Sequence, residues 1–213
     1  MRFVLAVFLV LDLTLGESNF GDTGFTGSSK RPAPADGTIY EQPYDFSSLA
    51  NGIYVHRPQY GGADNFTFAS QATVKSITFW TVFIGNGHPF DIAVDIYQNN
   101  SGEFGAIVWS DTVAAANQTE TLTGDQAWGL DLYRSDLQLQ SYPILPAGDY
   151  WLAMTVLGSS SPVGWLVSSP TVSPFMKQYD NGWHTTYYES WFGLYDHDVA
   201  LARTTWASIK TAF

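Results

Sequence analysis

The chain contains no cysteine, and this absence excludes several classes of chemistry at once. Without thiols it can have no catalytic cysteine, no disulfide, and no zinc or iron–sulfur site with cysteine ligands. Basic residues are also scarce, because 9 Lys and Arg stand against 20 Asp and Glu, for a formal net charge of −11. A surface of that sign repels phosphates, so we expect no nucleic-acid partner and no attachment to anionic lipid.

Long apolar runs are lacking as well. The apolar run at residues 3–11 is too short to cross a bilayer as a helix, and no second run reaches that length, so we expect no transmembrane segment. Arg2 precedes this run and the small residues Thr14 and Gly16 follow it, which is typical of a secretory signal. We therefore predict that residues 1–16 are a signal peptide and that the product is secreted, extracellular or associated with the cell surface.

Asp12 interrupts the signal pattern and leaves two alternatives open. Residues 11–15 read Leu-Asp-Leu-Thr-Leu, which alternates as a strand does, so they can be an ordinary strand of the mature protein. The same segment can also be a donor strand that adds to the open sheet edge of a neighbouring subunit.

Aromatic residues are what the chain has in excess. It contains 14 Phe, 12 Tyr and 8 Trp in 213 residues, whereas charged residues make up only 14%. Aromatic side chains favour pleated, half-buried surfaces. The length suits one domain of about 150–200 residues with flanking segments.

The flanking segments differ from the body in composition. Residues 17–38 are rich in Gly, Ser and Pro, which predicts a linker because such a segment buries too little apolar surface to offset its ordering entropy. In residues 204–213 the apolar Trp206, Ile209 and Phe213 are spaced as on one face of a helix, so we predict a short amphipathic helix there.

The body, residues 39–203, consists of short apolar runs separated by turn residues. Residues 74–83 are apolar on both faces, as in a central strand, and residues 90–97 place Ile92, Val94 and Ile96 on one face. We expect about ten strands and an all-β, jelly-roll-like antiparallel β-sandwich. The other predicted strands lie at residues 64–68, 107–109, 119–122, 130–133, 137–139, 149–156, 164–167, 175–179, 183–188 and 191–202.

Catalytic motifs are missing from the sequence. The four histidines have no metal-ligand spacing, and there is no phosphate-binding loop, His-Glu-x-x-His or Gly-x-Ser-x-Gly. Glycoside hydrolysis requires two carboxyl groups, and Glu189, between Tyr188 and Trp191, has the best environment for a raised pKa. One such glutamate is expected by chance among twenty acids, so we predict a protein without enzymatic activity.

Calcium is the only cofactor that the acidic residues suggest, since hard cations take oxygen ligands from loops. Asp91 and Asp95 bracket one predicted strand, and Asp196 and Asp198 share a face of the last one. The alternative is that all four are solvated residues of turns and strand ends.

Four aromatic residues form a candidate glycan-binding cluster. Trp183, Tyr187, Tyr188 and Trp191 lie within nine residues, and exposed rings of this kind stack on sugars. The alternative is that these rings pack beneath a loop.

Several segments carry a resemblance to a known group of proteins. Residues 63–68 (ADNFTF), 74–80 (VKSITFW), 90–97 (FDIAVDIY), 145–152 (LPAGDYWL) and 198–201 (DVAL) resemble secreted bacterial β-sandwich domains of surface proteins of the choice-of-anchor and PEP-CTERM kind. The resemblance implies extracellular display and a jelly-roll-like sandwich, and it supplies no catalytic residues. The chain departs from that pattern because no apolar anchor with a basic tail follows residue 203.

These observations predict a non-catalytic structural or adhesive protein outside the cell. Its partner would be a glycan, a surface protein or further copies of itself, and self-assembly by strand addition, with residues 3–15 as the donor, is the most specific form. The alternative is a carbohydrate-binding module or, less favoured, a glycoside hydrolase.

Overall fold

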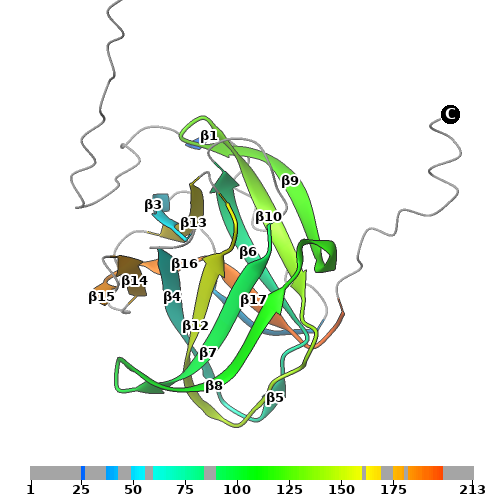
Figure 1. Ribbon diagram of the computed structural model, residues 1–213, viewed down its shortest axis with the longest axis vertical. Helices are drawn as coiled ribbons and strands as arrows, with labels where there is room; N and C mark the ends of the chain where they lie inside the picture. Colours follow the sequence, from blue (N-terminus) through cyan, green and yellow to red (C-terminus); the bar gives the residue numbers. More distant parts are fainter. Residues whose placement is uncertain are drawn as a thin grey trace, which may run out of the picture.

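The computed structural model describes residues 25–26, 37–42, 49–55, 60–83, 90–159, 162–168, 175–179 and 182–198. Two large antiparallel sheets and one small sheet make up this part of the chain, and its only helix is the single 3-10 turn η2 (Ala115–Asn117) (Figure 1). The predicted all-β, sandwich-like fold is therefore confirmed. The predicted signal peptide or donor strand at residues 1–16 and the amphipathic tail at residues 204–213 lie outside the described residues.

The larger sheet has nine strands, and β6 is at its centre. One side of β6 pairs with β10, and the other side is shared between β13 and β17. The nine strands are β1 (Phe25–Thr26), β9 (Gln118–Ala127), β10 (Leu130–Gln138), β6 (Ser76–Phe83), β13 (Val163–Ser168), β16 (Glu189–Ser190), β17 (Phe192–Tyr195), β2 (Thr38–Gln42) and β3 (Leu49–Tyr54).

The second large sheet has six strands, with β15 and β8 at its two edges. In spatial order they are β15 (Gly182–Thr186), β14 (Phe175–Tyr179), β4 (Gly61–Phe68), β12 (Gly148–Val156), β7 (Ile92–Asn100) and β8 (Glu103–Val113). A two-stranded sheet pairs β11 (Ile144–Leu145) with β5 (Ala72–Thr73).

The main core lies between the two large sheets. Ile92, Val94 and Ile96 all face it, as their alternation predicted. From the nine-stranded sheet, Trp165 packs edge-on against Phe79 with ring centroids 5.0 Å apart. Burial of such large apolar rings is the main force that holds the two sheets together.

A second buried layer covers the outer face of the nine-stranded sheet. Trp80 and Leu132 belong to it, together with Val82, Leu166 and Trp191. The strand β6 is thus buried on both faces, which confirms the prediction of a central strand at residues 74–83. The same burial explains why apolar alternation is weak in β6 and β13, since both faces avoid water.

Strand lengths depart from the sequence expectation where pairing continues through polar residues. The predicted strands at residues 130–133 and 137–139 are one strand, β10, because its residues pair with β6 on one side and β9 on the other. Residues 107–109 are part of the eleven-residue β8, and the last strand ends at Tyr195. Within the predicted linker, Phe25–Thr26 forms β1 on the edge of β9 and Thr38 begins β2.

Candidate functional site

The four predicted glycan-contact residues do not form one site. Trp183 packs on the outer face of the six-stranded sheet, Tyr187 is exposed beyond β15, and Tyr188 packs against the main core. Trp191 is fully buried, and its indole N–H donates a hydrogen bond to Ser168 Oγ at 2.7 Å. The prediction that Trp191 contacts a ligand is therefore wrong, because its ring is enclosed in the second buried layer.

Trp183 instead belongs to a cluster that we call the outer aromatic cluster, formed by Tyr97, Phe104, Trp151 and Trp183. Phe104 is central to it, with ring centroids 4.6 Å from Tyr97, 5.4 Å from Trp151 and 4.9 Å from Trp183. Trp151 is fully buried beneath the other three rings, which are partly exposed, and its indole N–H donates to the Glu103 carbonyl at 3.3 Å.

Strand alternation explains how this cluster forms on the outside of the sheet. In β12, Tyr150 and Leu152 face the main core, so Trp151 and Ala153 point outward. Small side chains at Ala63 and Ala153 leave room for a large ring beside Trp151. Tyr97 and Phe104 were not predicted from the sequence, although the alternation of Tyr97 with the buried Ile96 places Tyr97 on the outer face.

The predicted calcium ligands are not brought together. Asp91 is exposed and accepts the Ala115 N–H at 2.9 Å, whereas Asp95 accepts the Ser110 hydroxyl on the outer face of the six-stranded sheet. Asp196 and Asp198 are exposed near the end of β17, and Asp198 accepts the Tyr142 hydroxyl at 3.0 Å. Within the described ranges, no three His, Asp or Glu side chains lie close enough to hold a metal ion.

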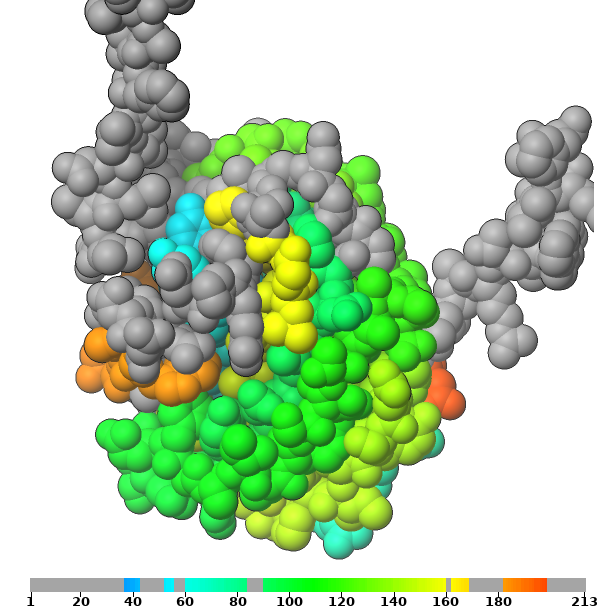
Figure 2. Space-filling view, viewed as in Figure 1, coloured from blue at the N-terminus to red at the C-terminus, as the bar shows by residue number. Residues whose placement is uncertain are grey.

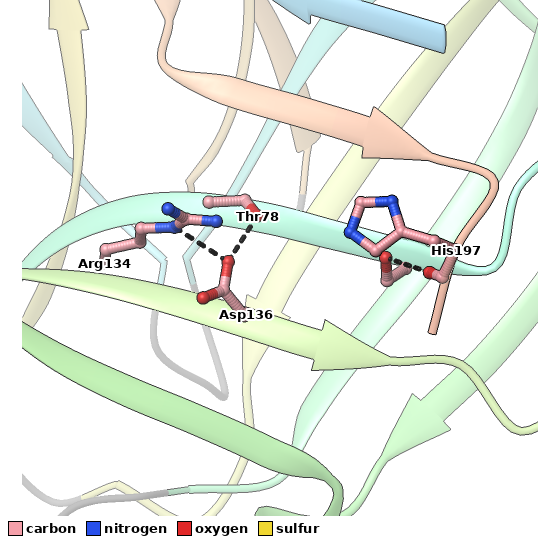
Figure 3. Close-up of polar contacts among 5 residues, drawn as sticks. Thr78, Arg134, Asp136 and His197 are labelled. Carbon is pink, nitrogen blue, oxygen red and sulfur yellow. Dashed lines mark hydrogen bonds and ion pairs between the residues drawn. The ribbon is translucent and has the colours of Figure 1, made fainter. Parts of the chain in front are cut away.

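A polar group lies on the outer face of the nine-stranded sheet (Figure 3). Asp136 of β10 accepts hydrogen bonds from Arg134 Nε, at 2.9 Å, and from the Thr78 hydroxyl of β6. Close by, the Ser76 hydroxyl donates to the backbone carbonyl of His197 at 2.8 Å. The imidazole ring of His197 takes part in none of the hydrogen bonds drawn in Figure 3. These bonds join β6 to β10 and to the residues after β17, so we assign the group a structural role.

Asp64 is a buried carboxyl group that the sequence analysis did not single out. Its side chain is fully buried at the inner face of β4, where it accepts the Ser190 hydroxyl at 2.9 Å and the Gln42 amide at 3.2 Å. The Ser190 and Asn65 N–H groups also donate to it. Because Ser190 and Gln42 belong to the nine-stranded sheet, Asp64 connects the two sheets.

The environment of Asp64 strongly favours its neutral form. Burial raises the pKa of this carboxyl from 3.8 to about 8, and the negative charge of Glu189 adds to the rise. Hydrogen bonds donated by Ser190 and Asn65 act in the opposite direction and lower the pKa. Desolvation is the largest of these effects, so the carboxyl binds a proton at a pH where an exposed aspartate is ionised.

The carboxyl groups of Asp64 and Glu189 interact electrostatically, so this pair was compared with the acid pair of a glycosidase. Such a pair must lie on either side of a bound sugar. Asp64 has no exposed surface and faces the core, so a substrate does not reach it in this structure. These two carboxyl groups therefore do not lie on either side of an accessible sugar site.

Comparison of the chain with protein-family models, with curated proteins and with solved structures found no match to any of them. The resemblance to choice-of-anchor and PEP-CTERM domains thus stays a prediction from the sequence. Among the described residues, none of the helices has the length and apolar character needed to cross a membrane.

Proposed function

We propose that this chain is a non-catalytic structural or adhesive protein outside the cell, which associates with further copies of itself by strand addition at β8. The observation that carries the proposal is the character of this edge. β8 has eleven residues, and its Ile107 and Val108 side chains are 56% and 44% exposed. Edge strands of monomeric proteins are usually short or protected by lysine or proline, and β8 contains neither.

One part of this edge has the regular geometry that strand addition requires. From Trp109 to Val113, β8 pairs residue for residue with β7, whereas the register shifts on the other side of Trp109. Figure 2 shows the green surface of this sheet with the yellow-green segment after β10 beside it, and Gln140 of that segment donates to Asp111 at 3.0 Å and to the Thr112 carbonyl at 3.4 Å. An added strand would displace Gln140 from the Thr112 carbonyl, continue the backbone ladder along residues 109–113 and cover Val108.

The occupant that fits best is the segment at residues 3–15 of a second copy, a segment outside the described residues. Its thirteen residues are enough to span the eleven of β8, and Asp12 is its single charged residue. Antiparallel pairing of two full β8 strands would instead put Glu103 of each copy two residues from Asp111 of the other. Like charges at that spacing disfavour this pairing.

Deleting residues 1–16 is expected to abolish oligomers, because the deletion removes the donor strand. Size-exclusion chromatography with light scattering on the full chain and on the deletion variant measures this. The mass of the exported product is the control, since it should still include residues 1–16. Unchanged assembly of the variant, or cleavage of the native product after about residue 16, would rule out this donor.

Val108→Lys is expected to weaken assembly of the full chain by about tenfold or more, since a lysine on an edge strand opposes strand addition. Sedimentation velocity over a range of concentrations gives the dissociation constant. Ile144→Lys is the matched control, because Ile144 is 62% exposed on β11, in the small sheet. An equal effect of the two substitutions would contradict a specific role of β8.

A further inference from the structure

We propose that the outer aromatic cluster binds a single chain of a neutral polysaccharide whose pyranose rings carry equatorial hydroxyl groups, as in β-linked glucose. This site goes beyond the proposed self-association, because it lies on the outer face of the six-stranded sheet and not on its edge. It also differs from the cluster predicted from the sequence, of which only Trp183 takes part.

The rings provide the apolar half of such a site. Tyr97, Phe104 and Trp183 are each partly exposed, and they rest on Trp151, which is fully buried. A pyranose with equatorial hydroxyls presents axial C–H groups on its faces, and these C–H groups pack against the negative face of an aromatic ring. Because Trp151 supports the other rings from below, they are held in place before a ligand binds, which lowers the entropic cost of binding.

The register of the sheet places polar side chains beside the rings. Asn65 of β4 is opposite Trp151, and Trp151 is opposite Tyr97, so all three lie in one row across the outer face. In the next row, Asp95 is opposite Ser110, whose hydroxyl donates to it. Amide and carboxylate groups next to apolar rings are what a sugar hydroxyl requires for orientation.

The negative charge of this face favours neutral sugars over anionic ones. Lys177 of β14 is the only Lys or Arg in the strands of the six-stranded sheet, and the register pairs it with Gly62, in the row of Met154 and not in that of Trp151. The acidic Asp95 and Glu103 lie next to the rings, and the whole chain has a formal net charge of −11. Sulfated, phosphorylated or uronic-acid polymers would be repelled, so the complementary ligand is a neutral glycan.

The angles between the rings favour a single glycan chain over a flat crystalline surface. Phe104 is inclined by 56° to Tyr97, by 48° to Trp151 and by 57° to Trp183. Rings with such inclinations share no common plane, so a flat polysaccharide crystal could not contact them together. A soluble chain can turn from one sugar to the next and follow them.

The test is isothermal titration of the full chain with cellohexaose and with laminarihexaose. We expect at least one of them to bind, and Trp183→Ala to weaken that binding at least tenfold. Tyr187→Ala is the matched control, because Tyr187 is 58% exposed but lies outside the cluster, and it should leave the affinity unchanged. If Trp183→Ala fails to fold, as judged by thermal melting, Tyr97→Ala is used in its place and should also weaken binding.

Three results would overturn the proposal. These are no binding of either oligosaccharide up to about 5 mM, equal weakening by Tyr187→Ala, and full affinity in the cluster variants. Retention on insoluble cellulose without binding of the soluble hexaoses would also contradict it. Light scattering of the same samples reports self-association separately, so failure of the glycan site and failure of assembly at β8 are distinguishable.

Discussion

Trp165→Ala is expected to lower the free energy of unfolding by about 3–5 kcal/mol, the range for loss of a fully buried large ring. Trp165 has no exposed surface, and it contacts Phe79 and Phe192 with ring centroids 5.0 Å and 6.1 Å away. Its indole N–H also donates to the Trp191 carbonyl at 3.0 Å. Alanine would leave a cavity between the sheets and remove this hydrogen bond, which connects the main core to the segment before β17.

Urea unfolding followed by circular dichroism measures the effect of Trp165→Ala. Trp109→Ala serves as the comparison, because Trp109 is only partly buried on the edge strand β8. This substitution should lower the free energy of unfolding by less than Trp165→Ala does. A loss below about 1 kcal/mol for Trp165→Ala would mean that β13 does not occupy the core position described above.

Asp64→Asn is expected to flatten the dependence of stability on pH. The pKa of Asp64 is about 8 in the folded chain, against an ordinary value of 3.8. Between these values the folded state holds one more proton than the unfolded state, so this group's stabilising contribution is complete below pH 4 and is lost as the pH rises toward 8. The loss has an upper limit of about 1.4 kcal/mol per pH unit.

The two side chains linked to Asp64 by hydrogen bonds, Gln42 and through it Tyr40, do not produce the same effect in that window. Burial and the charges of Asp64 and Glu189 raise the pKa of the Tyr40 hydroxyl above its ordinary value, so Tyr40 stays neutral there. The Gln42 side chain, which joins Tyr40 to Asp64, does not titrate. Of these three side chains, only that of Asp64 therefore changes its protonation state in the window that the experiment covers.

Urea unfolding of the native chain and of Asp64→Asn at pH 5 and pH 8 measures this effect. We expect the native chain to be less stable at pH 8 than at pH 5, and the difference to shrink in the variant. Asp149→Asn is the control, because it removes an exposed carboxylate that accepts the Thr67 hydroxyl at 2.6 Å. An equal pH dependence in the native chain and in Asp64→Asn would show that Asp64 is ionised in the folded protein.

The alternation of apolar and polar residues predicted the strands well where one face is buried and the other is exposed to solvent. Ile92, Val94 and Ile96 alternate with half-buried residues, and all three lie in the main core. The same rule failed for Asp64, which shares the inner face of β4 with Phe66 and Phe68 although it is acidic. A period of two assigns polar residues to solvent, and the donors of Ser190 and Gln42, which come from distant strands, add to the Asn65 N–H to make this burial tolerable.

The candidate sites depended even more on distant parts of the chain. Trp183 and Trp191 look equivalent in the sequence, yet one is partly exposed on the six-stranded sheet and the other is enclosed on the nine-stranded sheet. Phe104, which completes the outer aromatic cluster, belongs to β8. This strand is neither adjacent to β15 in the sequence nor paired with it in the sheet. A sequence pattern that spans only a few residues does not determine which strands become neighbours in a sheet.

The amino-acid sequence by itself determined the all-β class, the scarcity of positive charge and the absence of thiol chemistry, because composition and alternation act locally. The tertiary structure alone decided which aromatic rings are exposed, which edge is open and which carboxyl group is buried. The physical reason is that exposure depends on what covers a surface, and in this fold the covering residues come from strands far away along the chain.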